Sequence, residues 1–293
     1  MYVAAAVVCA SQLMGIDDDL TATSLVYAWS TALLAYLLDR VKLRDAWLDP
    51  ADARAHPERF AFLFAHRHTA RLVMLVAAMV SAWAGWRLHP VAVVGTGLTI
   101  AGVLLYAGTP RHSHARPRVK DRFILKNLFV GVGIAGFAVP VAGLGAAQGA
   151  GSHGAAAGAD LVARFLSHPA LAPAPILLSG LVFAYLTLRV YADAVLCDID
   201  DEDSDRAHDT RTLPTRLGAE PAWRAAMWLR LALAASLLFW PLGPFAARAA
   251  WAAISAVGTI LLRWWRPTRV RDLVDARFCV EAVGVWVVLT LVA

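Results

Sequence analysis

The chain has 293 residues, a formal net charge of +5 and a hydrophobic fraction of 59%. Its mean hydropathy of +0.57 excludes an ordinary soluble domain, because the apolar residues lie in blocks long enough to cross a bilayer. The three cysteines are scattered, which argues against a disulfide framework and against a zinc site.

Nine apolar segments follow one another along the chain and predict an all-α, polytopic membrane protein. The first segment is short, which suits a truncated, tilted or half-inserted helix. It lacks the basic start and the small-residue cleavage site of a signal peptide. We expect one transmembrane domain over residues 1–293. The segments lie at residues 2–16, 20–39, 70–88, 91–107, 124–145, 171–194, 222–241, 245–264 and 276–292.

The basic residues predict how these segments are oriented. Most of the 27 Lys and Arg residues lie in four connections, at 40–67, 111–126, 189–224 and 263–277. The positive-inside rule places these connections in the cytoplasm, so that the first segment starts inside and the last ends outside. The positive charge is then topological and does not indicate nucleic-acid binding. A basic rim would attract anionic membrane lipids and phosphorylated substrates.

Acidic residues follow the second apolar segment. Asp45 and Asp49 are four residues apart and share a helical face to within about 40°. Asp39 closes the segment beside Arg40 and lies about 120° away, so it joins the other two only if the helix bends. A salt-bridge network is the competing interpretation for Asp45 and Asp49, and an ion pair with Arg40 is the competing one for Asp39.

A denser acidic run follows the sixth segment. If that helix continues, Asp198, Asp201 and Asp205 share about 60° of arc, whereas Asp200 and Asp203 face the other side. Three carboxylates on one face suit Mg²⁺, which keeps positions open for phosphate oxygens or water. We therefore predict a metal face of Asp198, Asp201 and Asp205, and we expect Asp200 and Asp203 to be dispensable.

The two acidic clusters end segments four spans apart and lie on the same predicted side. This arrangement suggests two four-helix halves around a central cavity, each contributing carboxylates to a shared cytoplasmic mouth. A faint repeat agrees with it, since Arg-Val-Lys-Asp at 118–121 is echoed by Arg-Val-Arg-Asp at 269–272.

Two motifs resemble those of a known family, the UbiA superfamily of intramembrane prenyltransferases. Residues 198–206, DIDDEDSDR, and residues 211–218, RTLPTRLG, resemble its second aspartate-rich motif and the stretch that follows. Lys126-Asn127, at the start of the fifth segment, resembles the family's Lys-Asn pair. The nine-segment layout extends the resemblance over essentially the whole chain.

The first motif of that family is only partly matched. Asp45 and Asp49 correspond to its last two carboxylates, but Lys42 stands where the first Asp is expected and Val41 where Asn is expected. Asp39 could substitute from one turn earlier. This departure keeps the general chemistry but leaves the acceptor open.

The resemblance implies a Mg²⁺-dependent enzyme that transfers an isoprenyl group from an isoprenyl diphosphate to a lipophilic acceptor, such as an aromatic compound or a quinone precursor. The diphosphate would leave with metal assistance, and the acceptor would attack an allylic carbocation. The metal ligands would be Asp39, Asp45, Asp49, Asp198, Asp201 and Asp205, and the catalytic residues Lys126, Asn127, Lys120 and Arg206.

Two other functions fit part of the pattern. A membrane terpene cyclase would share the ionisation step but let the chain's own double bond attack the cation. A divalent-cation transporter would also need acidic groups, but these would lie near the midplane, and the RTLP stretch has no transport role. Arg189 and Asp193, inside the sixth segment, are expected to line the site or support it, and Glu281 has no assigned role.

Overall fold

The computed structural model describes residues 2–16, 21–41, 57–107, 124–149, 174–207, 210–242, 244–265 and 270–292. Every regular element within these ranges is helical. In chain order the helices are α1 (Tyr2–Met14), α2 (Ala22–Arg40), α4 (Pro57–Ala65), α5 (Arg67–Leu88), α6 (Pro90–Ala107), α7 (Leu125–Gly149), α9 (Ala174–Asp200), α10 (Glu202–Ala207), α11 (Leu213–Leu217), α12 (Ala219–Ser236), the 3-10 turn η4 (Leu237–Phe239), α13 (Phe245–Trp265) and α14 (Val270–Val292).

Each predicted apolar segment coincides with a helix in the part of the chain that the structure describes. Five stretches there are long and apolar enough to cross a membrane, namely Arg67–Leu88, Leu125–Gly145, Leu177–Asp200, Ala219–Phe239 and Phe245–Trp265. The protein is therefore an integral, multi-pass membrane protein, and the all-α prediction is confirmed. With 13 residues, α1 extends only about 20 Å, which is shorter than the apolar core of a bilayer.

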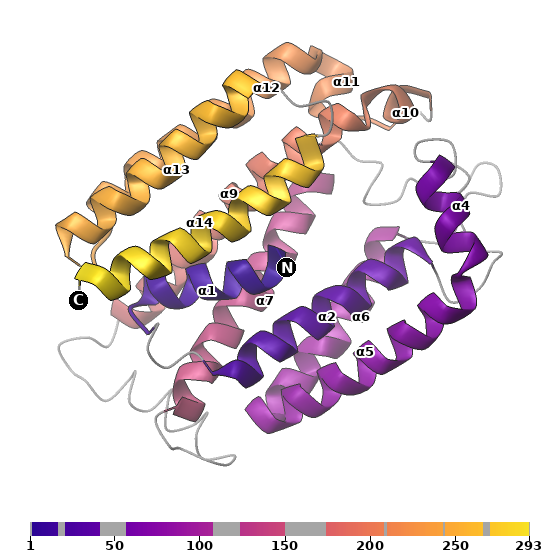
Figure 1. Cartoon of the computed structure of the whole chain (residues 1–293), viewed down its shortest axis with the longest axis horizontal. Coiled ribbons are helices and arrows are strands. Elements are labelled where there is room, and N and C mark those ends of the chain that lie inside the picture. The colour runs from indigo at the N-terminus through magenta and orange to yellow at the C-terminus, as the bar shows by residue number, and fades with distance from the viewer. Residues whose placement is uncertain are drawn as a thin grey trace.

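The long helices form two groups of four (Figure 1). Helices α2, α5, α6 and α7 pack together as a first half, and α9, α12, α13 and α14 as a second half. The halves meet where α7 packs along α9, while α1 lies between them and contacts α2, α7, α9 and α14. The predicted division into two four-helix units is thus visible in the helix contacts.

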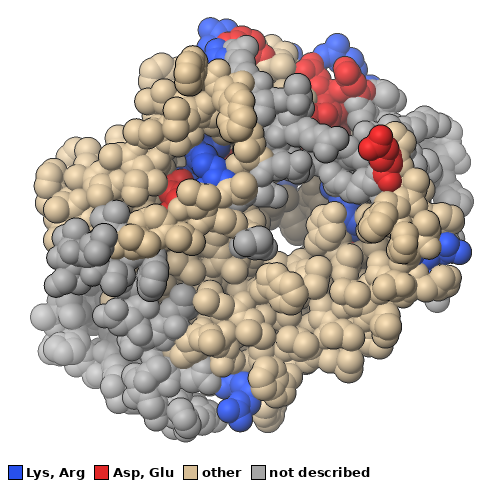
Figure 2. Space-filling view, in the orientation of Figure 1, with Lys and Arg blue, Asp and Glu red and all other residues tan. Residues whose placement is uncertain are grey.

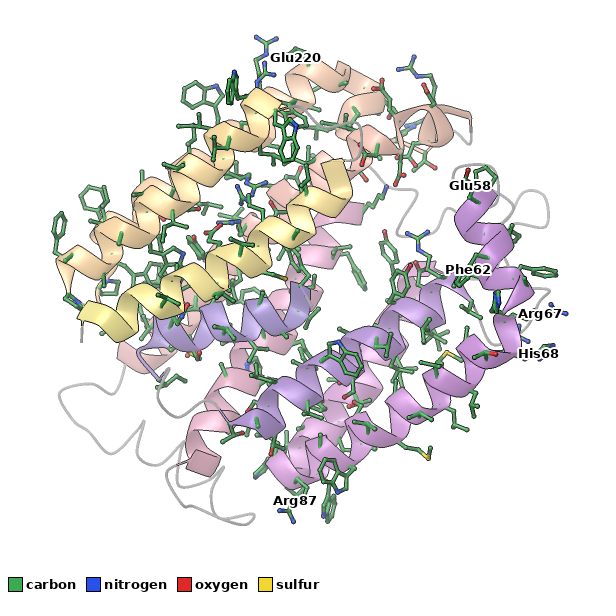
Figure 3. All side chains as sticks on the ribbon, in the orientation of Figure 1. Glu58, Phe62, Arg67, His68, Arg87 and Glu220 are labelled. Atoms are coloured by element: carbon green, nitrogen blue, oxygen red, sulfur yellow. The ribbon has the colours of Figure 1, made fainter. Side chains whose placement is uncertain are left out.

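The described acidic residues at the ends of α2 and α9 lie at one end of this bundle. We call the end that carries the last residues of α2 and α9 the motif end. Glu58, on α4, and Glu220, at the start of α12, lie at this end, whereas Arg87, at the end of α5, lies at the opposite one (Figure 3). The ion pair between Arg263 and Glu220, at 2.8 Å, joins the end of α13 to the start of α12 here.

The core of the first half contains a line of buried hydroxyl groups, which we call the hydroxyl chain. Thr31 Oγ1 lies 2.7 Å from Ser81 Oγ, which lies 2.9 Å from Thr96 Oγ1, and Thr96 donates to Tyr27 Oη at 3.1 Å. Tyr27 in turn donates to the Ala92 carbonyl. The hydroxyl chain therefore links α2, α5 and α6 through neutral groups alone.

The core of the second half contains ions instead. We call Arg189, Asp193, Arg230, Arg277 and Glu281 the charge cluster. Both guanidinium nitrogens Nη1 and Nη2 of Arg189 donate to the Glu281 carboxylate, at 3.1 and 2.5 Å. Arg230 Nη1 lies 2.8 Å from Asp193 Oδ1, and Arg277 Nη2 lies 3.5 Å from Glu281 Oε2. Arg189 and Arg230 are almost completely buried.

Neutral side chains complete the surroundings of the charge cluster. The Tyr2 hydroxyl donates to Asp193 at 2.8 Å, and this bond holds the first residues of α1 against α9. On α13, Ser255 and Thr259 accept from Arg189 and Arg277 at 3.0 and 2.9 Å. In Figure 2, a small group of basic and acidic side chains is visible between the helices of the second half.

Candidate active site

The metal-binding face predicted after the sixth segment begins on the last turn of α9. Asp198 is buried there, with only 3% of the residue exposed, whereas Asp200 and Asp203 are exposed. The shared face was predicted on the condition that the helix continues, and this condition is not met, because α9 ends at Asp200 and α10 starts at Glu202. Carboxylates are unfavourable at a helix C-terminus and favourable in a first turn, so the acidic run ends one helix and starts the next.

Despite this break between α9 and α10, the Asp205 carboxylate lies near Asp198. Its amide donates to the Asp201 carbonyl at 2.8 Å, so α10 stays beside the last turn of α9. Burial raises the pKa of Asp205 to about 6, the neighbouring Asp198 and Asp201 carboxylates add to the rise, and the Lys126 ammonium opposes it. The pKa therefore indicates a carboxyl group in a partly desolvated, acidic environment.

The first turn of α7 supplies the groups that face these carboxylates. Lys126 Nζ lies 2.7 Å from Asp198 Oδ1 and 3.4 Å from Asp205 Oδ2. The Asn127 side-chain amide donates to Asp198 Oδ2 at 2.8 Å. Both oxygens of Asp198 are thus bound by α7, and one ammonium lies between two carboxylates that are far apart in the run.

A glycine explains why α7 and α9 come this close. A Cβ added at Gly131 would lie 2.6 Å from the Thr187 carbonyl oxygen, which is closer than real Cβ atoms approach. Only a glycine allows the two backbones to touch at this height, one turn beyond Asn127. The helix contact therefore positions Lys126 and Asn127 against the end of α9.

The stretch at 211–218 forms the short helix α11 that turns the chain from α10 toward α12. Thr212 caps α11, its hydroxyl accepting from the Thr215 amide while the Thr215 hydroxyl accepts from the Thr212 amide, and Pro214 sits near the start. Gly218 ends the helix with a φ of +90°, a conformation that favours glycine. Because α11 also contacts α9, the motif fixes the connection that follows the acidic run.

The other predicted site residues are placed less centrally. Asp39 lies 3.5 Å from Arg40 Nε at the end of α2, the ion pair that was its competing interpretation. Arg206 pairs with Glu202 at 2.5 Å on α10, and its side chain is 64% exposed. Asp45, Asp49 and Lys120 lie outside the described residues. Within the described ranges, no group of three or more His, Cys, Asp or Glu side chains is arranged to hold a metal ion.

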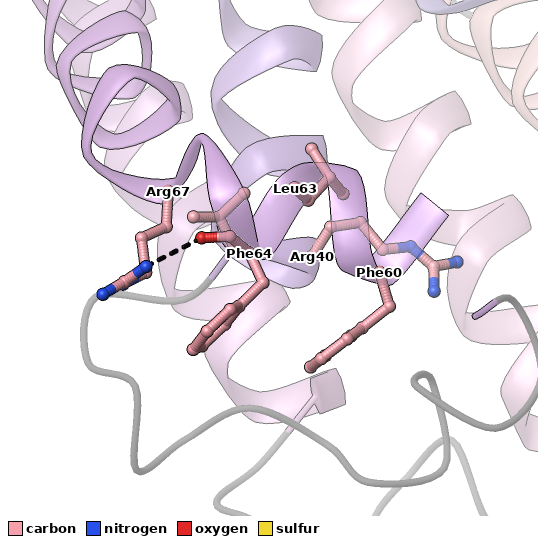
Figure 4. Close-up of a pocket in the computed structure, with 6 residues that line it drawn as sticks. Arg40, Phe60, Leu63, Phe64 and Arg67 are labelled. Atoms are coloured by element: carbon pink, nitrogen blue, oxygen red, sulfur yellow. Dashed lines mark hydrogen bonds between the residues drawn. The ribbon is translucent and has the colours of Figure 1, made fainter. Parts of the chain in front are cut away.

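A small hollow lies where α4 meets the end of α2 (Figure 4). Its walls include Arg40, Phe60, Phe64 and Arg67. The two guanidinium groups point away from each other in Figure 4, and Arg67 donates to the Phe64 carbonyl at 2.9 Å. Because the two guanidinium groups do not converge, the hollow is a contact between packed helices and does not form an anion-binding site.

Arg189 and Asp193, which were expected near the site, belong to the charge cluster inside the second half. Sequence analysis missed their partner Arg230, which the structure places 2.8 Å from Asp193. The available signal was position in the sequence, since Asp193 and Arg230 both lie inside apolar helices, and ionisable groups within a membrane pair with one another.

Comparison with protein families identifies the family to which this chain belongs. The model of the UbiA prenyltransferase family matches residues 2–285. The chain belongs to this family. Membership confirms the resemblance seen in the motifs and implies prenyltransferase activity, with an isoprenyl diphosphate and an acceptor as substrates and a general dependence on Mg²⁺. No curated protein and no solved structure matches the chain significantly.

Proposed function

We propose that this UbiA-family protein transfers an isoprenyl group to a lipophilic aromatic or quinone-precursor acceptor, at a site on the cytoplasmic side of the membrane. The observation that carries the proposal is the convergence of Asp198 and Asp205 on one ammonium group, Lys126 Nζ, at the end of a membrane-spanning helix. Two carboxylates that converge on one cation offer oxygen ligands of the kind that a divalent metal ion binds.

The donor set fits Mg²⁺. Asp198 and Asp205 present oxygen ligands to the position that the ammonium now neutralises, and Asp201 lies between them in the chain, one helical turn before Asp205. The further ligands that we propose are Asp45, Asp49 and Asp39 from the first cluster. When bound there, Mg²⁺ would supply positive charge that offsets the negative charge developing on the departing diphosphate.

The protein's own groups have three roles in this proposal. Asn127 orients Asp198 by holding its second oxygen, and Lys126, with Lys120 and Arg206, offers cationic donors to the departing diphosphate. The apolar helices exclude water from the allylic cation. The C–O bond breaks with its electron pair leaving on the diphosphate, the acceptor forms the new C–C or C–heteroatom bond, and it then loses a proton.

The test uses purified protein in detergent, Mg²⁺ and radiolabelled geranyl, farnesyl or geranylgeranyl diphosphate, with and without an extract of membrane lipids and quinone precursors. We expect Mg²⁺-dependent diphosphate release and a labelled product that requires the extract. A labelled cyclic hydrocarbon formed without extract would replace transfer by cyclisation. No Mg²⁺-dependent release with any chain length would overturn the proposal.

Single substitutions test the two clusters. Asp201→Asn and Asp45→Asn should each reduce turnover at least a thousandfold while the protein stays monodisperse in detergent, because each removes a charged ligand from the metal site. Asp203→Asn, on the exposed side of α10, is the matched control and should retain activity. Full activity in Asp45→Asn would remove the first cluster from the mechanism.

A further inference from the structure

The contacts of Asp198 carry a consequence for how metal enters the site. The carboxylate is buried and both its oxygens are already bound, Oδ1 by Lys126 at 2.7 Å and Oδ2 by Asn127 at 2.8 Å. Lys126 Nζ also lies 3.4 Å from Asp205 Oδ2. The ammonium therefore occupies the space between two of the proposed metal ligands.

A metal ion and this ammonium cannot share that space. Mg²⁺ binds carboxylate oxygens at about 2.0–2.1 Å, so an ion on Oδ1 would lie beside Nζ, and two cations in a partly buried site repel each other strongly. We propose that Lys126 is an exchangeable counter-ion: it neutralises Asp198 and Asp205 in the metal-free protein, and divalent metal binding displaces its ammonium from both carboxylates. This inference rests on the metal site of the proposed function.

The position of Lys126 supports an exchange over a permanent ion pair. It lies in the first turn of α7, where the helix dipole disfavours a cation, so its placement depends on the two carboxylates. Its four-carbon stem lets the ammonium move while the backbone stays in place. Asn127 is neutral and holds the other oxygen of Asp198, so the carboxylate keeps its orientation after the ammonium leaves.

Metal affinity without isoprenyl substrate tests the exchange. Mn²⁺ binding to purified protein would be measured by electron paramagnetic resonance, with and without inorganic diphosphate. Removing the competing cation should tighten binding, so Lys126→Met is expected to bind Mn²⁺ at least tenfold more tightly than the unmodified chain. Lys126→Arg keeps the charge and should not tighten it. Arg224→Gln removes an exposed cation that pairs with Glu220 and should leave the affinity unchanged.

The outcomes separate the inference from the proposed function. Equal or weaker Mn²⁺ binding by Lys126→Met in the absence of diphosphate, with measurable binding by the unmodified chain, would overturn the exchange and leave the metal site standing. Absence of Mn²⁺ binding in every variant and condition would overturn both. If Lys126→Met is recovered only when Mn²⁺ is present during purification, the metal has taken over the role of the ammonium, as the exchange predicts.

The unmodified chain provides a second measurement. Nζ of Lys126 is shielded by its carboxylate partners, and its side chain is 15% exposed. Displacement by metal should raise its labelling by an amine-acetylating reagent severalfold, as read by mass spectrometry. Asp198→Asn is the matched control, because its Lys126 should label readily with or without Mn²⁺. Unchanged labelling of Lys126 in the unmodified chain at saturating Mn²⁺ would overturn the exchange.

Discussion

The two halves of the bundle have the same helix arrangement but different polar cores. The first half is crossed by the hydroxyl chain, in which neutral groups such as Ser81 and Thr96 bond to one another. The second half contains the charge cluster, in which Arg189 and Glu281 form a bidentate pair away from water. The difference lies in the cost of losing one member: an unpaired hydroxyl is a small penalty, whereas an unpaired buried ion is a large one.

The second half also carries Asp198, the buried carboxylate of the candidate site. The charge cluster ties α9 to α12 and α14, and Asp193 lies only about 10 Å along α9 from its last residue. An ionic core thus holds the helix that presents Asp198. The cluster has three guanidinium groups and two carboxylates, so we expect loss of a carboxylate to be worse than loss of a guanidinium.

The largest effect is expected for Glu281→Gln. The change removes the bidentate partner of Arg189, which is 1% exposed, and leaves three guanidinium groups facing the single carboxylate of Asp193, so it should lower the free energy of unfolding by about 3–5 kcal/mol. Thermal unfolding in detergent measures it. Glu220→Gln is the matched control, because its partners are surface arginines and its loss should cost at most about 1 kcal/mol. Equal losses of unfolding free energy in the two variants would mean that the charge cluster stabilises the protein no more than a surface ion pair does.

Gly131→Ala should disturb the contact that joins the halves. The added methyl group meets the Thr187 backbone, so we expect a loss of about 1–3 kcal/mol from overpacking. We also expect about a tenfold loss of prenyl transfer, because Lys126 and Asn127 move away from Asp198. Gly133→Ala, whose Cβ would meet nothing within 4 Å, should leave stability and activity unchanged. If Gly131→Ala and Gly133→Ala had similar activity, the contact between α7 and α9 would not determine the geometry of the site.

Arg277→Met tests the predicted asymmetry of the charge cluster. Methionine keeps an apolar stem beside Gly258, where the arginine stem now lies, and the change leaves two guanidinium groups facing two carboxylates. The cost should stay below about 2 kcal/mol, and thermal unfolding should separate it clearly from Glu281→Gln. A loss as large as that of Glu281→Gln would contradict the charge count.

The smallest effect is expected in the first half. Ser81→Ala removes the hydroxyl that bonds to both Thr31 and Thr96, and the expected loss is about 0.5–1 kcal/mol, as for hydrogen bonds between membrane helices. Thr99→Ala, which loses only a bond to Gly95 within its own helix, should cost less by thermal unfolding. A Ser81→Ala loss comparable to that of Glu281→Gln would erase the distinction between the two cores.

The amino-acid sequence by itself determined the order of the apolar helices that the structure describes, since apolar length depends on local composition. It also determined the family, because the motifs around Asp198 and Thr212 are contiguous. It predicted Lys126 and Asn127 as candidate site residues, but their contact with Asp198 joins positions about seventy residues apart. Composition and spacing do not specify such contacts.

Only the tertiary structure decided which polar groups meet. It ended α9 within the acidic run, brought Asp205 back to Lys126, and placed Arg189 and Asp193 in the core of the second half. Each outcome depends on whether the free-energy cost of burying a charge is offset by the interaction with an oppositely charged partner. That balance is set by helices that are distant in sequence and, at Gly131 and Thr187, by how closely two backbones can approach.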